Sequence, residues 1–246
     1  FFDWNLLDDE VYAEYVSSAN RYRNQPTGKP DSAGTVQVVG KSLFVDGRPF
    51  QVRGVGYQPT PICSSPTSRE VLDHMYTDPC ILARDLPRLR AMNVNTIRIW
   101  VEPPDATVLD ACYNGGFQPI FVIMGFWIDP GLDYGDPATI ESLENGFRSY
   151  VNRFKCHPAV LAWGIGNENN LSYAGNLADW FALANRLACV AYAEEAEAYH
   201  PTMVINGGMR HFGDMSLGSD DVSMKCVDAW GHNAYPGEDF HCYFDY

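Results

Sequence analysis

The chain has 246 residues, of which 46% are hydrophobic, 13% aromatic and 20% charged, and its formal net charge at pH 7 is −14. This composition is ordinary for a globular protein with one large domain or two small ones. The acidic balance excludes nucleic acids and anionic membrane surfaces as partners, because both require clustered Lys and Arg. No run of eighteen apolar residues occurs, so we expect no transmembrane segment.

The first 34 residues are predicted to be an appendage. Residues 6–23 have the apolar spacing of an amphipathic helix. Residues 24–34 are rich in Pro, Gly and small polar side chains and read as a linker. We therefore expect two parts, a helix and linker over residues 1–34 and one domain over residues 35–246.

The domain is predicted to begin with three short strands, at 36–39, 42–45 and 49–55. Tight-turn sequences separate them, Gly40-Lys41 and Asp46-Gly47. This pattern predicts an antiparallel hairpin that leads into the rest of the domain.

From there strands and helices alternate, which is the pattern of parallel βα units. Apolar runs predict strands at 51–57, 95–101, 118–124, 159–167, 202–206 and 227–233. Amphipathic spacing predicts helices at 78–92, 105–114, 137–155 and 173–199, with a shorter irregular piece at 212–224. Several strands are apolar on both faces, as in a barrel wall covered by helices.

Six such strands fit an open doubly wound sheet as well as an unfinished barrel. A doubly wound sheet usually has a Gly-rich phosphate loop after its first strand, and this sequence has none. Instead, polar and aromatic residues follow several strands, and barrel enzymes place their chemistry at those ends. We therefore predict an α/β fold, a (β/α)₈ TIM barrel of which about six strands lie in this chain. The candidate residues at these ends are Tyr57, Arg98, Trp100, Trp127, Asn167, Glu168, His232 and Tyr235.

The clearest chemical signal is the segment 162–169 (AWGIGNEN). A buried apolar strand ends there in an amide, Asn167, and a carboxylate, Glu168, and a carboxylate at such a place seldom lacks a partner or a task. A carboxyl group surrounded by little water can hold a proton near neutrality and donate it to a glycosidic oxygen. The alternative is a structural ion pair between Glu168 and Arg98.

Three segments resemble the clan A glycoside hydrolases. Residues 36–61 resemble their first strand and the hairpin before it, residues 95–100 (NTIRIW) their second strand, and residues 163–168 (WGIGNE) their fourth strand. Within this clan the chain is most similar to the β-1,3-glucanosyltransferases of glycoside hydrolase family 72. The motifs that carry this likeness are Asp78-Pro79-Cys80, Arg84-Asp85-Leu86-Pro87 and Leu109-Asp110-Ala111-Cys112. Trp163-Gly164 and Gly231-His232-Asn233 are similar to bacterial β-galactosidase and β-mannanase barrels as well.

The resemblance implies a retaining β-glycosidase or transglycosylase that acts on β-glucan, with β-1,3 linkages. Glu168 would be the general acid/base, and the reaction would need no metal or cofactor. Asn167 would bind a sugar hydroxyl, Arg98 would lie near the catalytic carboxylates, and Trp127 would be a stacking platform. Trp100 and Tyr235 take the places of tyrosines in the glucan groove, and Tyr57 and His232 are expected at the same rim. For these aromatic residues core packing is the alternative.

A retaining enzyme needs a second carboxylate as nucleophile, about 5–5.5 Å from the first. In this clan it is a Glu that ends strand seven, whereas we predict six strands and place Glu238 in a loop. We therefore expect the polypeptide to continue, with the nucleophile outside this chain. The alternative is a catalytically silent barrel that serves as a structural or carbohydrate-binding module of an extracellular assembly. A cofactor-dependent cytosolic enzyme fits less well, since no nucleotide-binding motif is present.

Seven scattered cysteines, without CxxC or zinc-binding spacing, indicate disulfides and a secreted or cell-surface protein. Buried free thiols in a cytosolic enzyme are the alternative. The family pattern implies a bond between Cys80 and Cys112, and we also predict Cys226–Cys242 and Cys156–Cys189. The sequon Asn170-Leu171-Ser172 could carry a glycan, which would crowd the site.

Overall fold

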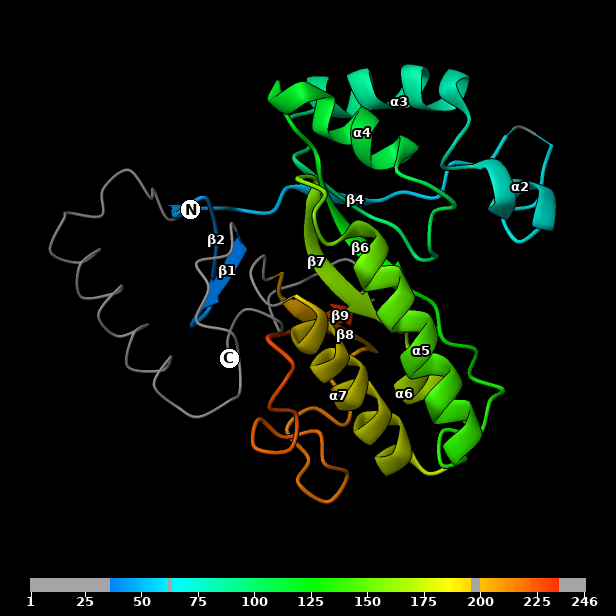
Figure 1. The fold of residues 1–246 in the computed structure, drawn as a ribbon, viewed down its shortest axis with the longest axis vertical. Helices are drawn as coiled ribbons and strands as arrows, with labels where there is room; N and C mark the ends of the chain where they lie inside the picture. The colour runs from blue at the N-terminus through cyan, green and yellow to red at the C-terminus, as the bar shows by residue number, and fades with distance from the viewer. Residues whose placement is uncertain (1–35, 62, 196–199, 235–246) are drawn as a thin grey trace, which may run out of the picture.

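The computed structural model describes residues 36–61, 63–195 and 200–234 (Figure 1). They form one parallel sheet whose strand order follows the chain, β4-β5-β6-β7-β8-β9. The strands are β4 (Gly54–Gly56), β5 (Thr96–Arg98), β6 (Phe121–Phe126), β7 (Val160–Ile165), β8 (Thr202–Gly207) and β9 (Ala229–Asn233). This is the arrangement of successive βα units in a (β/α)₈ barrel, with six of its strands, so the predicted fold class is confirmed. The helix and linker predicted for residues 1–34 lie outside the described residues.

Helices connect most of the strands. They are α2 (Arg69–His74), α3 (Pro79–Ala91), α4 (Thr107–Tyr113), α5 (Pro137–Phe154), α6 (Asn169–Ser172) and α7 (Leu177–Glu194), with a 3₁₀ turn η2 (Asn114–Gly116). The three longest helices, α3, α5 and α7, begin after Asp78, Asp136 and Asn176, whose side chains accept hydrogen bonds from the first free backbone N–H groups. The segment between β8 and β9 is a series of turns. The four predicted helices are present as α3, α4, α5 and α7, and α7 begins four residues later than predicted. The sequence pattern did not indicate the short helices α2 and α6.

The core lies between the sheet and its covering helices. Helices α5 and α7 run side by side over β7 (Figure 1). Every residue of β7 is buried, as expected for a strand covered on both faces. Trp163 of β7 is fully buried, and its ring contacts Phe147 and Tyr150 of α5 at centroid distances of 6.3 and 5.5 Å. None of the helices among the described residues is long and apolar enough to cross a membrane.

The predicted hairpin is present as a small antiparallel sheet of β1 (Val36–Val39), β2 (Ser42–Val45) and β3 (Arg48–Pro49). Its second turn places Asp46 and Gly47 at φ values of 51° and 72°, the conformation that short hairpin turns require. Val36 and Val45 pack against Leu161 near the start of β7. The hairpin thus packs against the N-terminal end of the parallel sheet.

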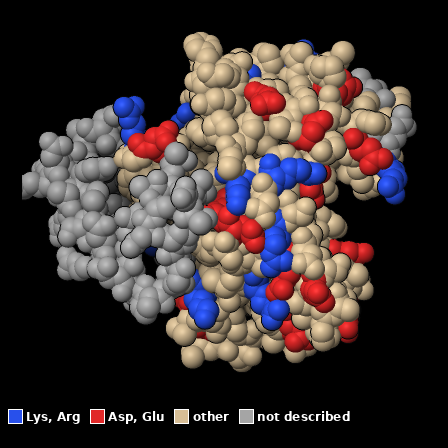
Figure 2. All heavy atoms as spheres, viewed as in Figure 1, with Lys and Arg blue, Asp and Glu red and all other residues tan. Residues whose placement is uncertain are grey.

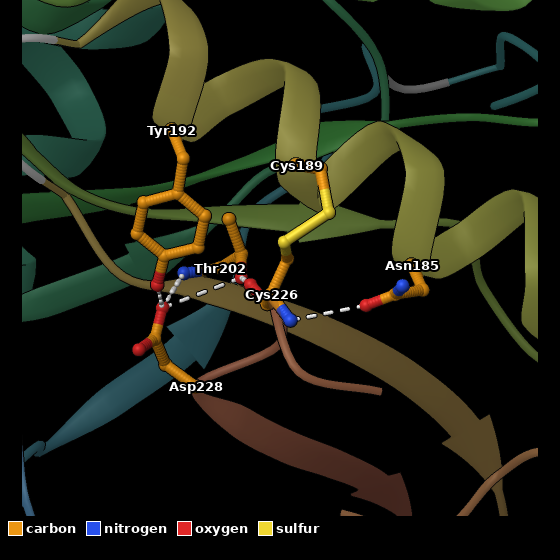
Figure 3. The surroundings of a disulfide bond; sticks show 6 residues. All are labelled: Asn185, Cys189, Tyr192, Thr202, Cys226 and Asp228. Atoms are coloured by element: carbon orange, nitrogen blue, oxygen red, sulfur yellow. Dashed lines mark hydrogen bonds between the residues drawn. A yellow bond between two sulfur atoms is a disulfide. The ribbon is translucent and has the colours of Figure 1, made fainter. Parts of the chain in front are cut away.

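One disulfide joins Cys189 of α7 to Cys226, which precedes β9 (Figure 3). The predicted pairs Cys156–Cys189 and Cys226–Cys242 are therefore wrong, because Cys189 and Cys226 bind each other. Spacing along the chain could not show that α7 returns across the segment before β9. Cys156 is exposed just beyond α5 and remains a free thiol.

The predicted bond between Cys80 and Cys112 is not formed either. Cys80 is exposed in the first turn of α3, whereas Cys112 of α4 is fully buried in the core. Burial raises the pKa of the Cys112 thiol to about 12, so it behaves as a small apolar core side chain. One thiol lies at the surface and the other in the core, so the two do not form the predicted bond.

Hydrogen bonds reinforce the junction around the disulfide (Figure 3). Asp228 accepts one from the backbone N–H of Thr202 at 2.9 Å and another from the hydroxyl of Tyr192. The backbone N–H of Cys226 donates to Asn185 of α7 at 3.0 Å. Together these contacts tie α7 to the starts of β8 and β9, at the end of the sheet remote from the strand ends that carry chemistry.

We expect Cys189→Ser to destabilise the fold by about 4 kcal/mol, because the bond closes a loop with a sequence separation of 37 residues. Urea unfolding of the oxidised protein measures this loss. Cys156→Ser removes an exposed free thiol and is the matched control, with an expected change near zero. Equal stability of the two variants would show that the disulfide contributes little.

Candidate functional site

Four polar side chains lie at the C-terminal ends of β5, β7 and β9, which are alternate strands of the parallel sheet. Arg98 ends β5, Asn233 ends β9, and Asn167 and Glu168 follow β7. Parallel strands place all such ends at one edge of the sheet. In the structure these four residues converge there through a set of hydrogen bonds.

The carbonyl oxygen of the Asn167 side chain is the centre of this set. It accepts hydrogen bonds from Arg98 Nη2 at 2.8 Å, from Trp100 Nε1 at 3.2 Å and from Asn233 Nδ2 at 3.1 Å. The guanidinium of Arg98 also lies 4.9 Å from the ring centroid of Trp100. Three donors on one oxygen fix the amide of Asn167, so its own N–H₂ group faces away from them.

Glu168 is attached to this cluster through Asn233. Asn233 Nδ2 donates to Glu168 Oε1 at 2.9 Å, and Asn233 Oδ1 accepts from Arg98 Nη1 at 3.3 Å. Sequence reasoning missed Asn233 and chose its neighbour His232 instead. Alternation along β9 was the available signal, since adjacent residues of a strand point to opposite faces.

The backbone of Glu168 has an unusual conformation, with φ 56° and ψ 25° in the left-handed region. Non-glycine residues hold this conformation at a cost of about 1–3 kcal/mol, and do so mainly where the surroundings impose it. Here its N–H donates to Ile205 of β8 at 2.9 Å. Asn169 Oδ1 accepts from the N–H of Asn167 at 2.8 Å, while Asn169 Nδ2 donates to Tyr134 and to Ile128. The turn that presents Glu168 is therefore rigidly held.

Two glycines make room for the site. A Cβ atom at Gly207 would lie 2.3 Å from Leu171 Cδ1 and 3.2 Å from Glu168 Cγ. A Cβ atom at Gly56 would lie 2.3 Å from Cη2 of Trp100. Larger residues at these positions would displace the carboxylate side chain and the indole.

The other predicted site residues lie outside the amide cluster. Tyr57 is 6% exposed, its N–H donates to the carbonyl of Arg98, and its hydroxyl donates to Asp85 at 3.3 Å. Burial, and then the charge of Asp85, raise the pKa of Tyr57 far above its usual value. Tyr57 therefore lies at the end of β4 beside Arg98, as expected, but its side chain packs in the core instead of joining the amide cluster. His232 is half-buried, with Nδ1 at 2.9 Å from the carbonyl of Gly208. Trp127 is 47% exposed just beyond β6.

The last two predicted residues are Tyr235 and Asn170. Tyr235 lies outside the described residues. Asn170 is 3% exposed, and its amide nitrogen donates to the carbonyl of Gly207 while its oxygen accepts from the N–H of Gly207. A glycan on that nitrogen would disrupt these contacts, so the structure opposes the predicted glycosylation. The amide instead fixes Gly207 beside Glu168.

Acidic and basic side chains are interspersed on the face shown in Figure 2. Several form ion pairs between α5 and α7, among them Arg148–Glu194 and Arg186–Glu144. The part of the chain that the structure describes contains no group of three or more His, Cys, Asp or Glu residues suited to a metal ion.

Comparison with known proteins points to carbohydrate-active enzymes. The family model described as glucanosyltransferase matches residues 27–186. The probable 1,3-beta-glucanosyltransferase GAS3 of Saccharomyces cerevisiae is 32% identical over 129 residues, which are 50% of this chain and 24% of that protein. A beta-galactosidase of Arthrobacter sp. is 29% identical over 174 residues, 68% of this chain and 16% of that protein.

Solved structures agree on the fold. The beta-glucuronidase of Bacteroides uniformis superposes with a TM-score of 0.58 at 23% identity, over 80% of this chain and 22% of that one. A family 2 glycosyl hydrolase of Bacteroides cellulosilyticus gives 0.57 at 17% identity, over 82% and 24%. The chain spans less than a third of the length of the curated relatives it matches, which are covered over 16% to 32%.

Proposed function

The chain belongs to the glucanosyltransferase family, and we propose on this premise that it forms the acid/base half of the active site of a retaining β-glycosidase or transglycosylase. The proposed substrate is β-glucan with β-1,3 linkages. The observation that carries the proposal is the hydrogen-bonded cluster at the sheet edge, in which Asn233 and Arg98 hold Asn167 and Glu168 in one fixed arrangement.

The chemistry follows from the position of Glu168. Its carboxyl group donates a proton to the glycosidic oxygen as the bond from that oxygen to the anomeric carbon breaks. A second carboxylate, supplied by a strand beyond the six described here, forms the glycosyl-enzyme ester. Glu168, now ionised, takes a proton from a water or sugar hydroxyl, whose oxygen displaces that ester and restores both carboxyl groups.

Asn167 is proposed to bind the sugar itself. Its oxygen is occupied by three donors, so its N–H₂ group is the end that remains to meet a hydroxyl beside the anomeric carbon. Hydrogen bonds of this kind strengthen in the transition state of glycoside hydrolysis. Trp100 and Arg98 then serve mainly to orient Asn167.

Aromatic side chains would hold the rest of the polymer. Trp127, exposed beyond β6, offers a flat apolar surface for a sugar ring. Tyr235 and His232 are further candidates for substrate contact. A secreted or cell-surface location is supported by the family and by the disulfide between Cys189 and Cys226.

The proposal is tested with the full-length protein that contains this chain. β-1,3-Gluco-oligosaccharides of defined length are incubated with it, and the products are separated by size. Shorter products indicate hydrolysis, and products longer than the substrate indicate transfer to a sugar acceptor. Binding of the oligosaccharide without any product would replace the proposal with the catalytically silent carbohydrate-binding barrel.

A further inference from the structure

We propose that Asn233 is a positioning residue that holds the carboxyl group of Glu168 in the orientation in which it exchanges the proton. This inference rests on the proposed function and concerns a residue of β9 that lies two strands away from Glu168 in the sheet. It follows from the direction of each hydrogen bond around the Asn233 amide.

The amide of Asn233 can adopt only one orientation in this cluster. Its oxygen accepts from Arg98 Nη1 at 3.3 Å, and a guanidinium has donors only. Its nitrogen donates to Glu168 Oε1 at 2.9 Å and to Asn167 Oδ1 at 3.1 Å. A flipped amide would bring nitrogen against the guanidinium and oxygen against two acceptors, so Arg98 fixes the donor toward Glu168.

The fixed donor holds one oxygen of Glu168 in place. A carboxyl group can still accept a hydrogen bond after it has taken up a proton, so this contact can persist in both protonation states of Glu168. Asn233 therefore anchors the carboxyl group of Glu168 through Oε1. The carboxyl group is held in the same orientation when it donates the proton and when it takes one back.

Two substitutions separate the parts of this arrangement. Asn233→Asp keeps an oxygen acceptor for Arg98 but removes the N–H donor to Glu168 and Asn167. Asn233→Ala removes both contacts. Asn152→Asp is the matched control, because Asn152 Nδ2 also donates to a glutamate, Glu194 Oε2 at 2.7 Å, but at the far ends of α5 and α7.

The experiment compares two substrates of the full-length protein. One is a natural β-1,3-gluco-oligosaccharide, whose leaving group needs protonation. The other is the corresponding dinitrophenyl β-glycoside, whose leaving group departs without it, so the initial burst of dinitrophenol reports bond cleavage alone. We expect both Asn233 variants to lose roughly 10- to 100-fold in kcat on the natural substrate, because misdirected catalytic groups lose rate steeply. KM and the burst rate should change less than about threefold, and Asn152→Asp should match the wild type.

The outcomes separate this inference from the function it rests on. Equal losses of kcat and burst rate, or unchanged kcat on the natural substrate, would overturn the positioning role while the proposed function stands. A lower melting temperature of both Asn233 variants, with losses on both substrates, would make the residue merely structural. Absence of turnover by the wild-type protein on either substrate would overturn the function and the inference together.

Discussion

Replacing Glu168 by Gln is expected to lower the turnover of natural β-glucan by about 10²–10⁴-fold while substrate binding stays largely intact. The amide has the size of the carboxyl group and can still accept the hydrogen bond from Asn233 at the Oε1 position. It cannot give up and recover a proton. The loss should therefore appear in kcat rather than in KM.

Steady-state kinetics on β-1,3-gluco-oligosaccharides measure this loss, and a dinitrophenyl glycoside provides the internal control. Its cleavage needs little protonation, so formation of the glycosyl-enzyme should be partly spared in Glu168→Gln. Turnover of the natural substrate near the wild-type rate would remove Glu168 from the role of acid/base.

Replacing Glu195 by Ala is expected to destabilise the fold by about 3–5 kcal/mol. Glu195 is 1% exposed, and its oxygens accept from Trp163 Nε1 at 3.0 Å, from His200 Nδ1 at 2.7 Å and from the N–H of His200 at 2.8 Å. Its removal leaves these buried donors without partners. The cluster connects the end of α7 to the start of β8. Its removal should therefore lower the stability of the whole sheet.

Chemical denaturation measures this effect, and Glu194→Ala is the control at the next position. Glu194 forms a partly exposed ion pair with Arg148, of a kind that contributes about 0–1 kcal/mol. Similar losses for both variants would show that the buried network adds little beyond helix packing.

The strands and long helices could be predicted because each carries a local signal. β7 is apolar along its whole length, and α3, α5 and α7 begin at a capping Asp or Asn, so pattern and caps agree. The short helix α6 has no such signal. It forms because Glu168 and the residues after it are held by contacts with β8 and with Asn169.

The sequence placed the candidate residues at the ends of strands, but it did not show which of these residues contact each other. Asn167, Glu168, Arg98 and Trp100 were found because they end or follow strands that local patterns indicate. Asn233 also ends a predicted strand, but its contacts with Glu168 and Arg98 span 65 and 135 residues of sequence, so the strand end alone did not distinguish it from its neighbour His232. The disulfide pairs failed for the same reason, since Cys189 meets Cys226 only through the path of α7 over the sheet.

Chemical rescue of Glu168→Ala in the full-length protein tests the central claim most directly. The variant should form a glycosyl-enzyme from a dinitrophenyl β-glycoside and then stall, because no base remains to activate water. Azide needs no base, so it should restore release of dinitrophenol and yield a β-glycosyl azide, identified by NMR. An α-glycosyl azide would make Glu168 the nucleophile, and failure of azide to accelerate a stalled reaction would contradict its assignment as the acid/base.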